Sequence, residues 1–130
     1  MADLNDGGLQ IPPPIFLDME GEVLELTDNF IKTRFPVKER YQNPFGYMQG
    51  GMVVAAMDNT IGPLSFTVAP PNVTTQLNIS YIRPVTPDMA YIFVEATVKE
   101  KTRKMVFIEA RALSPEGKVL SIAQATHQVL

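Results

Sequence analysis

One long apolar segment does most to limit how this chain can fold. From Gly50 to Val68 the residues favour a helix, and the apolar ones cover most of its circumference: Met52, Val53, Ala55, Ala56, Met57, Ile61 and Leu64. A helix that is apolar on nearly every side is enclosed by other elements rather than lying on a surface. The sequence therefore predicts a helix wrapped by a sheet, and Gly62-Pro63 predicts that its regular part kinks or ends near Ile61.

Segments with a two-residue period lie on both sides of this helix. Between residues 22 and 37, apolar residues alternate around Thr27-Asp28-Asn29, which indicates two short strands or one bent strand. After the helix, four further strands are predicted, at 74–81, 90–99, 104–113 and 119–130. One helix followed by consecutive antiparallel strands indicates an α+β fold, with an antiparallel sheet wrapped around one long central helix.

The strand at 74–81 shows the clearest alternation. Its period puts Thr74 on a polar face, and the full polar set is Thr74, Gln76, Asn78 and Ser80. The opposite face carries Thr75, Leu77, Ile79 and Tyr81. The sequence therefore predicts a strand with one polar face.

Length and composition indicate one globular domain. The chain has 130 residues, of which 45% are apolar and 19% charged. Residues 1–17 are polar and then rich in proline (Pro12-Pro13-Pro14), which predicts an extended N-terminal arm. The domain itself is predicted at 18–130.

Several functional classes are disfavoured by composition. No apolar run approaches 18 residues, so no membrane span is predicted, and the N-terminus lacks the pattern of a signal peptide, which favours the cytoplasm. The absence of cysteine excludes disulfides, a thiolate nucleophile and a cysteine metal site. A net charge of −3 argues against nucleic acid as a partner.

The start of the helix has the features of an anion site. A turn signal at Asn43-Pro44 and Gly46 leads into the pair Gly50-Gly51. Glycines that open a helix leave its first N–H groups bare and let a ligand oxygen approach the backbone. The helix dipole adds partial positive charge there, which suits an anion or a developing oxyanion.

Asp58 is the one carboxylate in the apolar segment. An unpaired carboxylate is costly to bury, so it must be paired, protonated or next to water; facing solvent or capping a neighbour would be the structural alternative. It lies eight residues beyond Gly50, which is roughly 12 Å along a helix axis. A base must come within about 3 Å of its target, directly or through one water. Asp58 is therefore either not catalytic or acts at the helix start of a second copy of the chain, and we favour the second interpretation.

The pattern Asn43-x-x-Gly46-x-x-Gln49-Gly50-Gly51 followed by Asp58 resembles the active-site signature of the hotdog-fold thioesterases, in particular the phenylacetate-degradation thioesterase-like branch. The likeness extends from about Val23 to the end of the chain and includes the segment 74–84. The family commonly has histidine where this chain has Gln49. A glutamine amide can donate a hydrogen bond but cannot titrate.

The resemblance implies a role for each matching residue. Gly50 would donate its backbone N–H to the thioester carbonyl, and Asn43 would orient that carbonyl or the nucleophile. Asp58 would be the base or nucleophile from the partner subunit, and Thr74 would help to place water. Gln49 would orient the carbonyl or simply cap the helix.

Substrate contacts are expected along the helix and at basic residues. An apolar tunnel for the acyl group would be lined by residues such as Met52, Val54 and Met57, with Gly51 beside the carbonyl. The predicted phosphate contacts are Arg83, Lys101, Arg103 and Lys104, of which Arg103 and Lys104 bracket a hairpin. Ordinary surface charge is the alternative for each of them. No metal is required, and no cofactor other than the coenzyme A of the substrate.

His127 is the only histidine, and its place near the C-terminus predicts a surface residue at a strand end. One histidine cannot build a Ser-His-Asp set or a histidine metal site. The predicted function is hydrolysis of acyl-CoA thioesters by a homodimer or a homotetramer (a dimer of dimers). The alternatives are a hotdog protein that binds acyl-CoA without hydrolysis, as a sensor or carrier, a hydratase or dehydratase, and an oligomer with a vestigial cleft.

Overall fold

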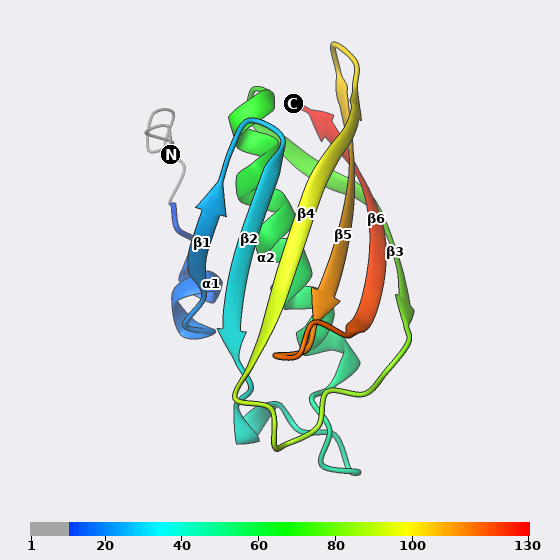
Figure 1. The fold of residues 1–130 in the computed structure, drawn as a ribbon. Coiled ribbons are helices and arrows are strands. Elements are labelled where there is room, and N and C mark those ends of the chain that lie inside the picture. The colour runs from blue at the N-terminus through cyan, green and yellow to red at the C-terminus, as the bar shows by residue number, and fades with distance from the viewer. Residues whose placement is uncertain (1–10) are drawn as a thin grey trace.

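A six-stranded antiparallel sheet curves around one long helix in the computed structural model, which describes residues 11–130 (Figure 1). The elements are α1 (Pro14–Asp18), β1 (Glu22–Leu26), β2 (Phe30–Pro36), the 3₁₀ turn η1 (Glu39–Tyr41), α2 (Gly50–Val68), β3 (Asn72–Tyr81), β4 (Tyr91–Lys101), β5 (Met105–Leu113) and β6 (Val119–Val129). The strand order is β1-β2-β4-β5-β6-β3. The predicted α+β class and the antiparallel sheet around a central helix are confirmed.

α2 begins at Gly50 and ends at Val68, as the sequence predicted. The helix does not end near Ile61 but continues through Pro63. Ile61 and Leu64, on either side of the proline, are both fully buried, and this packing outweighs the one backbone hydrogen bond that proline removes. Among residues 11–130, no helix combines the length and apolarity needed to cross a bilayer.

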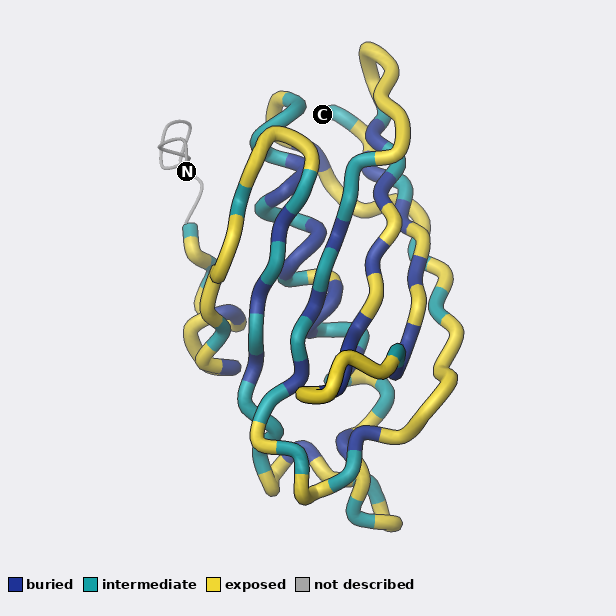
Figure 2. The backbone as a smooth tube through the Cα atoms, in the orientation of Figure 1, coloured by how far each residue is buried: buried dark blue, intermediate teal, exposed yellow. Residues whose placement is uncertain are grey.

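The core lies between α2 and the sheet, and Figure 2 shows the buried residues along their facing sides. The buried residues of α2 are Val53, Ala56, Met57, Thr60, Ile61, Leu64 and Ser65. Gly51 and Asp58 are exposed on another side of the helix. The sheet of this chain therefore covers one face of α2 and leaves the face with Asp58 open.

The N-terminal segment differs in part from the predicted extended arm. Residues 1–10 lie outside the described residues, whereas Pro14–Asp18 form the helix α1. Pro14 fits at the first turn of a helix, where its missing N–H has no partner to lose. Phe16 of α1 is buried and meets the ring of Phe35 edge to face, with 5.7 Å between ring centroids. Residues 14–17 therefore belong to the folded domain.

β3 contains a bulge that changes which of its residues face α2. Thr74 pairs with His127 and Gln76 pairs with Thr126, so Thr75 is an extra residue between them. Because paired residues share a face, Thr74 and Leu77 lie on the same side of the sheet, toward α2. The regular alternation predicted for this strand, with Thr74 on the polar face, is therefore wrong at Thr74.

Thr33 and Thr60 form a buried hydroxyl pair whose two members are not equivalent. Thr60 Oγ1 donates to the carbonyl oxygen of Ala56 at 2.8 Å, so Thr33 is the donor in the 2.7 Å contact between the two hydroxyls. Thr60→Val leaves the Thr33 hydroxyl buried without an acceptor and is expected to lower the free energy of unfolding by about 1–3 kcal/mol. Thr33→Val removes only a donor and is the matched control.

Urea denaturation of the two valine variants at one protein concentration measures the difference. Thr60→Val should be clearly less stable than Thr33→Val. Equal losses would contradict the assigned direction of the hydrogen bond.

Candidate functional site

Asn43 builds the loop that leads into α2. Its Oδ1 accepts hydrogen bonds from the backbone N–H groups of Phe45 (2.9 Å) and Tyr47 (3.1 Å). Gly46 has a φ of 84°, a left-handed conformation that suits glycine, and its N–H bonds to the Asn43 carbonyl at 2.9 Å. Since the side-chain oxygen of Asn43 is occupied, its amide nitrogen is the group that it can offer to a substrate.

The first turn of α2 is open to a ligand, as the sequence predicted. Gln49 is the N-cap residue; its side chain is exposed and makes no capping hydrogen bond, so the capping alternative for Gln49 is wrong. The first backbone hydrogen bonds at this end come from Met52 and Val53, both to the Gln49 carbonyl. Within the described chain, the N–H groups of Gly50 and Gly51 therefore have no backbone acceptor.

Tyr81, at the end of β3, holds this helix start in place. Its hydroxyl donates to the carbonyl oxygen of Gly50 at 2.7 Å, and burial raises the pKa of that hydroxyl above its ordinary value of 10.0. A Cβ atom on Gly50 would lie 3.0 Å from the Tyr81 ring, closer than nearly all such contacts. Glycine at position 50 is thus needed for this close packing.

A pocket of about 330 Å³ adjoins the helix start. Its lining residues are Asn43, Tyr47, Met48, Gly50, Val53, Tyr81, Ile82, Arg83, Pro84, Val85 and Ser121. The structure therefore brings together three of the predicted site residues, Asn43, Gly50 and Arg83. Arg83 is anchored there, because its Nη1 donates to the carbonyl oxygen of Val119 at 2.7 Å.

Asp58 belongs to a second group of polar residues, farther along α2. Thr74 Oγ1 donates to Asp58 Oδ1 at 3.2 Å and lies 3.1 Å from His127 Nε2. His127 Nδ1 lies 2.8 Å from Asn72 Oδ1. The bulge at Thr75 makes this possible, because it turns the Thr74 hydroxyl toward α2.

His127 is buried, with 3% of its surface exposed, so its predicted position on the surface is wrong. It lies inside β6, where it faces α2 together with Ser121, Ala123 and Ala125. Burial lowers the pKa of His127 below its ordinary value of 6.5, and the negative charge of Asp58 partly offsets that shift. The alternation of small residues along 121–127 was the sequence signal for this inward position.

The remaining predicted binding residues are scattered over the chain. Met57 is fully buried in the core, so on its own chain it does not line an open tunnel. Gly51 is exposed beside the helix start. Arg103 and Lys104 are exposed in the β4–β5 hairpin, which lies at the end of the sheet where α2 finishes (Figure 1). Arg83 follows β3 at the opposite end, so these three residues are not one cluster within the chain.

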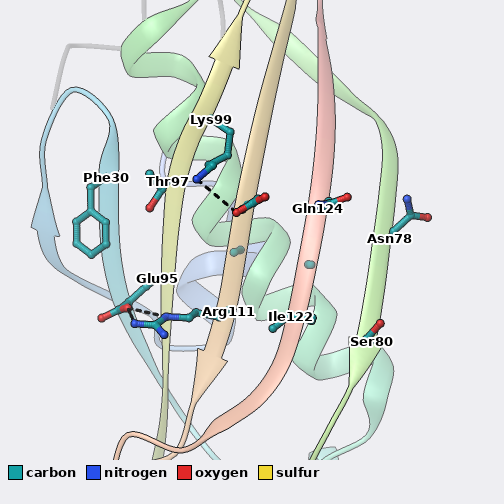
Figure 3. A pocket seen from close by; sticks show the side chains of 12 residues that line it. Phe30, Asn78, Ser80, Glu95, Thr97, Lys99, Arg111, Ile122 and Gln124 are labelled. Atoms are coloured by element: carbon teal, nitrogen blue, oxygen red, sulfur yellow. Dashed lines mark hydrogen bonds and ion pairs between the residues drawn. The ribbon is translucent and has the colours of Figure 1, made fainter.

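A larger pocket, of about 560 Å³, lies on the face of the sheet that is turned away from α2 (Figure 3). Cross-strand ion pairs line it: Arg111 with Glu95 at 2.8 Å and Lys99 with Glu109 at 3.7 Å. None of the predicted site residues borders this pocket. Within residues 11–130, no three His, Cys, Asp or Glu side chains gather closely enough to hold a metal ion.

The chain is similar to a protein family and to individual known proteins. The model of the thioesterase superfamily matches residues 45–121, which include Gly50, Asp58 and Thr74. A protein of Saccharolobus solfataricus that is named as an esterase is 26% identical to this chain over 107 residues. The match covers 81% of this chain and 75% of that protein.

Two solved structures show the same hotdog fold. The PaaI protein of the E. coli phenylacetic acid degradation operon has a TM-score of 0.86 at 12% identity, covering 92% of this chain and 86% of that one. A hypothetical thioesterase of Streptococcus pneumoniae TIGR4, solved with coenzyme A, has a TM-score of 0.81 at 18% identity, covering 88% and 96%.

Proposed function

Because the chain belongs to the thioesterase superfamily, we propose that it hydrolyses acyl-coenzyme A thioesters at a site shared between two chains. The observation that carries this proposal is the hydrogen bond that holds the exposed carboxylate of Asp58 to Thr74 of the edge strand β3. The open helix start at Gly50 supplies the second half of the site. The coenzyme A bound to the related S. pneumoniae protein supports the choice of thiol.

Strand β3 supports the pairing of two chains. It is a ten-residue strand at the edge of the sheet, and most of its residues are exposed. Such an edge presents unpaired N–H and C=O groups to another strand. If two copies of β3 pair in antiparallel fashion, in the register centred between Leu77 and Asn78, Thr74 of one chain lies opposite Tyr81 of the other. Since Thr74 holds Asp58 and Tyr81 holds Gly50, this pairing brings Asp58 to the helix start of the partner.

The chemistry then follows from the groups at each helix start. The N–H of Gly50 and the helix dipole polarise the thioester carbonyl. The amide nitrogen of Asn43 donates a hydrogen bond that orients the substrate. Asp58 of the facing chain activates water or attacks the carbonyl directly. Gln49, whose side chain is exposed, donates a further hydrogen bond but no proton. The acyl group lies along the open face of α2.

Coenzyme A phosphates would meet Arg83 beside the pocket and, in the paired arrangement, the hairpin of the partner with its Arg103 and Lys104. Guanidinium groups suit phosphate because they bind two oxygens at once. A homodimer of this kind has two identical sites, and a tetramer would be built from two such dimers.

A thiol-release assay over a panel of aryl and aliphatic acyl-CoA esters tests the function. We expect saturable release of free coenzyme A with at least one class of acyl group. Tight binding of the esters without thiol release would instead favour an acyl-CoA sensor or carrier. The same esters on pantetheine, which lacks the nucleotide phosphates, should show a raised KM if Arg83 binds phosphate.

Mixing two inactive variants tests whether the site is shared. Asp58→Asn removes the carboxylate, and Gly50→Val displaces Tyr81 and blocks the helix start. A mixed dimer has one doubly defective site and one intact site, so exchange of subunits should restore about a quarter of the wild-type activity. Mixtures that stay inactive after subunit exchange has been verified would show that both groups act within one chain.

A further inference from the structure

We propose that Asp58, Thr74 and His127 form a proton relay in which His127 holds the proton that Asp58 takes from the attacking water. This inference rests on the proposed hydrolysis and goes beyond it, because it gives a role to a buried histidine. The relay is a continuous series of contacts: 3.2 Å from Asp58 Oδ1 to Thr74 Oγ1, then 3.1 Å to His127 Nε2.

The hydrogen bonds of Asn72 fix which nitrogen of His127 can accept a proton. The Nδ2 of Asn72 donates to the carbonyl oxygen of Pro70 at 2.8 Å, which identifies its Oδ1 as the acceptor for His127 Nδ1 at 2.8 Å. Nδ1 must therefore carry hydrogen. In neutral His127, Nε2 is then the bare nitrogen, and it points at Thr74.

Thr74 has one hydroxyl hydrogen between two acceptors. When Asp58 is ionised and His127 is neutral, the hydroxyl can satisfy only one of them. Two arrangements satisfy every group: protonated Asp58 donating to Thr74 and Thr74 to Nε2, or protonated Nε2 donating to Thr74 and Thr74 to ionised Asp58. They differ by the transfer of one proton through the hydroxyl.

The transfer fits the proposed reaction without another reactant. The water oxygen bonds to the thioester carbon as one of its O–H bonds breaks, and the Asp58 carboxylate takes that proton. The carboxyl group turns to give the proton to Thr74 Oγ1, and Thr74 gives its own hydrogen to His127 Nε2. Asp58 is again ionised. When the C–S bond of the tetrahedral intermediate breaks, the imidazolium returns its proton by the same route to the departing thiolate.

The surroundings of His127 suit a group that holds a proton only briefly. Its neighbours across the sheet, Val106 on β5 and Thr74 on β3, are uncharged. From α2, the charge that acts on it is that of Asp58. Burial keeps the imidazole neutral at rest, and Asp58, once ionised again, stabilises the imidazolium.

Nitrogen NMR of the imidazole tests the relay without any activity, because tag-free protein contains one histidine. In the wild type we expect hydrogen on Nδ1 and none on Nε2 above the pKa. Thr74→Val removes the acceptor of the imidazolium Nε2–H and should lower the pKa of His127, whereas Thr74→Ser should preserve it. Thr75→Val is the control, because the Thr75 hydroxyl bonds to the Thr126 carbonyl and not to the histidine.

Kinetics then tests the use of the relay. Hydrolysis should fall on the acid side with an inflection at the pKa of His127 measured by NMR. His127→Gln should remove this inflection and lower kcat by about 10-fold to 100-fold, the loss typical for a group that acts through another residue. KM should stay the same.

Hydrogen on Nε2 in the neutral wild type, an unchanged pKa in Thr74→Val, or an unchanged inflection in His127→Gln would each overturn the relay. If no acyl-CoA ester is hydrolysed, the proposed function fails, and the NMR results still decide whether the three groups are coupled.

Discussion

Replacing Asp58 with asparagine is expected to lower kcat for acyl-CoA hydrolysis by about 10²–10⁴-fold, the usual contribution of a general base. Asparagine keeps the shape of the side chain and an oxygen that can accept from Thr74, but it cannot take a proton. The loss should therefore fall on kcat rather than on KM. Thiol release measured over a range of substrate concentrations separates the two parameters.

Asp88→Asn is the matched control, because Asp88 is an exposed aspartate in the loop between β3 and β4. It should retain wild-type turnover. Size-exclusion chromatography should show the same oligomer for both variants and the wild type. Full turnover in Asp58→Asn would remove the carboxylate from the mechanism.

Phe35→Ala is expected to lower the free energy of unfolding by about 3–5 kcal/mol, as is usual when a buried phenylalanine is truncated. Phe35 is fully buried on β2 and meets Phe16 of α1, so the change would also loosen the short N-terminal helix. Gly21 packs close to both rings, because a Cβ there would lie 2.6 Å from Phe35, and glycine has no side chain that could fill the space left by the ring. A domain is typically stable by about 5–15 kcal/mol, so this one truncation would remove a large share.

Phe45→Ala provides the comparison, because Phe45 is 82% exposed. Its loss of stability should stay within about 0.5 kcal/mol, as for most surface substitutions. Urea denaturation of both variants at one protein concentration gives the difference. Similar losses in the two variants would show that α1 and β2 are not packed as described.

The central helix and the strands after it could be predicted because their patterns are long. The helical pattern runs over the nineteen residues from Gly50 to Val68, although Gly62-Pro63 predicted a kink or an end near Ile61. The helix start at Gly50 and the carboxylate at Asp58 could be recognised as well, since both depend on local spacing along one helix. That the two act on one substrate remains a proposal, because it depends on a second chain.

Other features depend on contacts between distant segments, so the local sequence pattern gave little indication of them. The bulge at Thr75 follows from the register of β3 against β6, which no local pattern determines. His127 comes near Thr74 through that register, across 53 positions of sequence. A proline-rich segment tends to stay extended. The packing of Phe16 against Phe35 stabilises the helix α1 instead.

The bulge in β3 also predicts how this strand tolerates variation. Substitutions at Thr75 leave the pairing of its neighbours intact, so many side chains should be accepted there. Removing Thr75 would make the pleat regular, and Thr74 would stay opposite His127 on the side of the sheet that faces α2. The Thr74 hydroxyl would therefore still be directed toward α2 in a strand that is one residue shorter. The position of Thr75 is therefore expected to tolerate both a change of residue type and the loss of the residue.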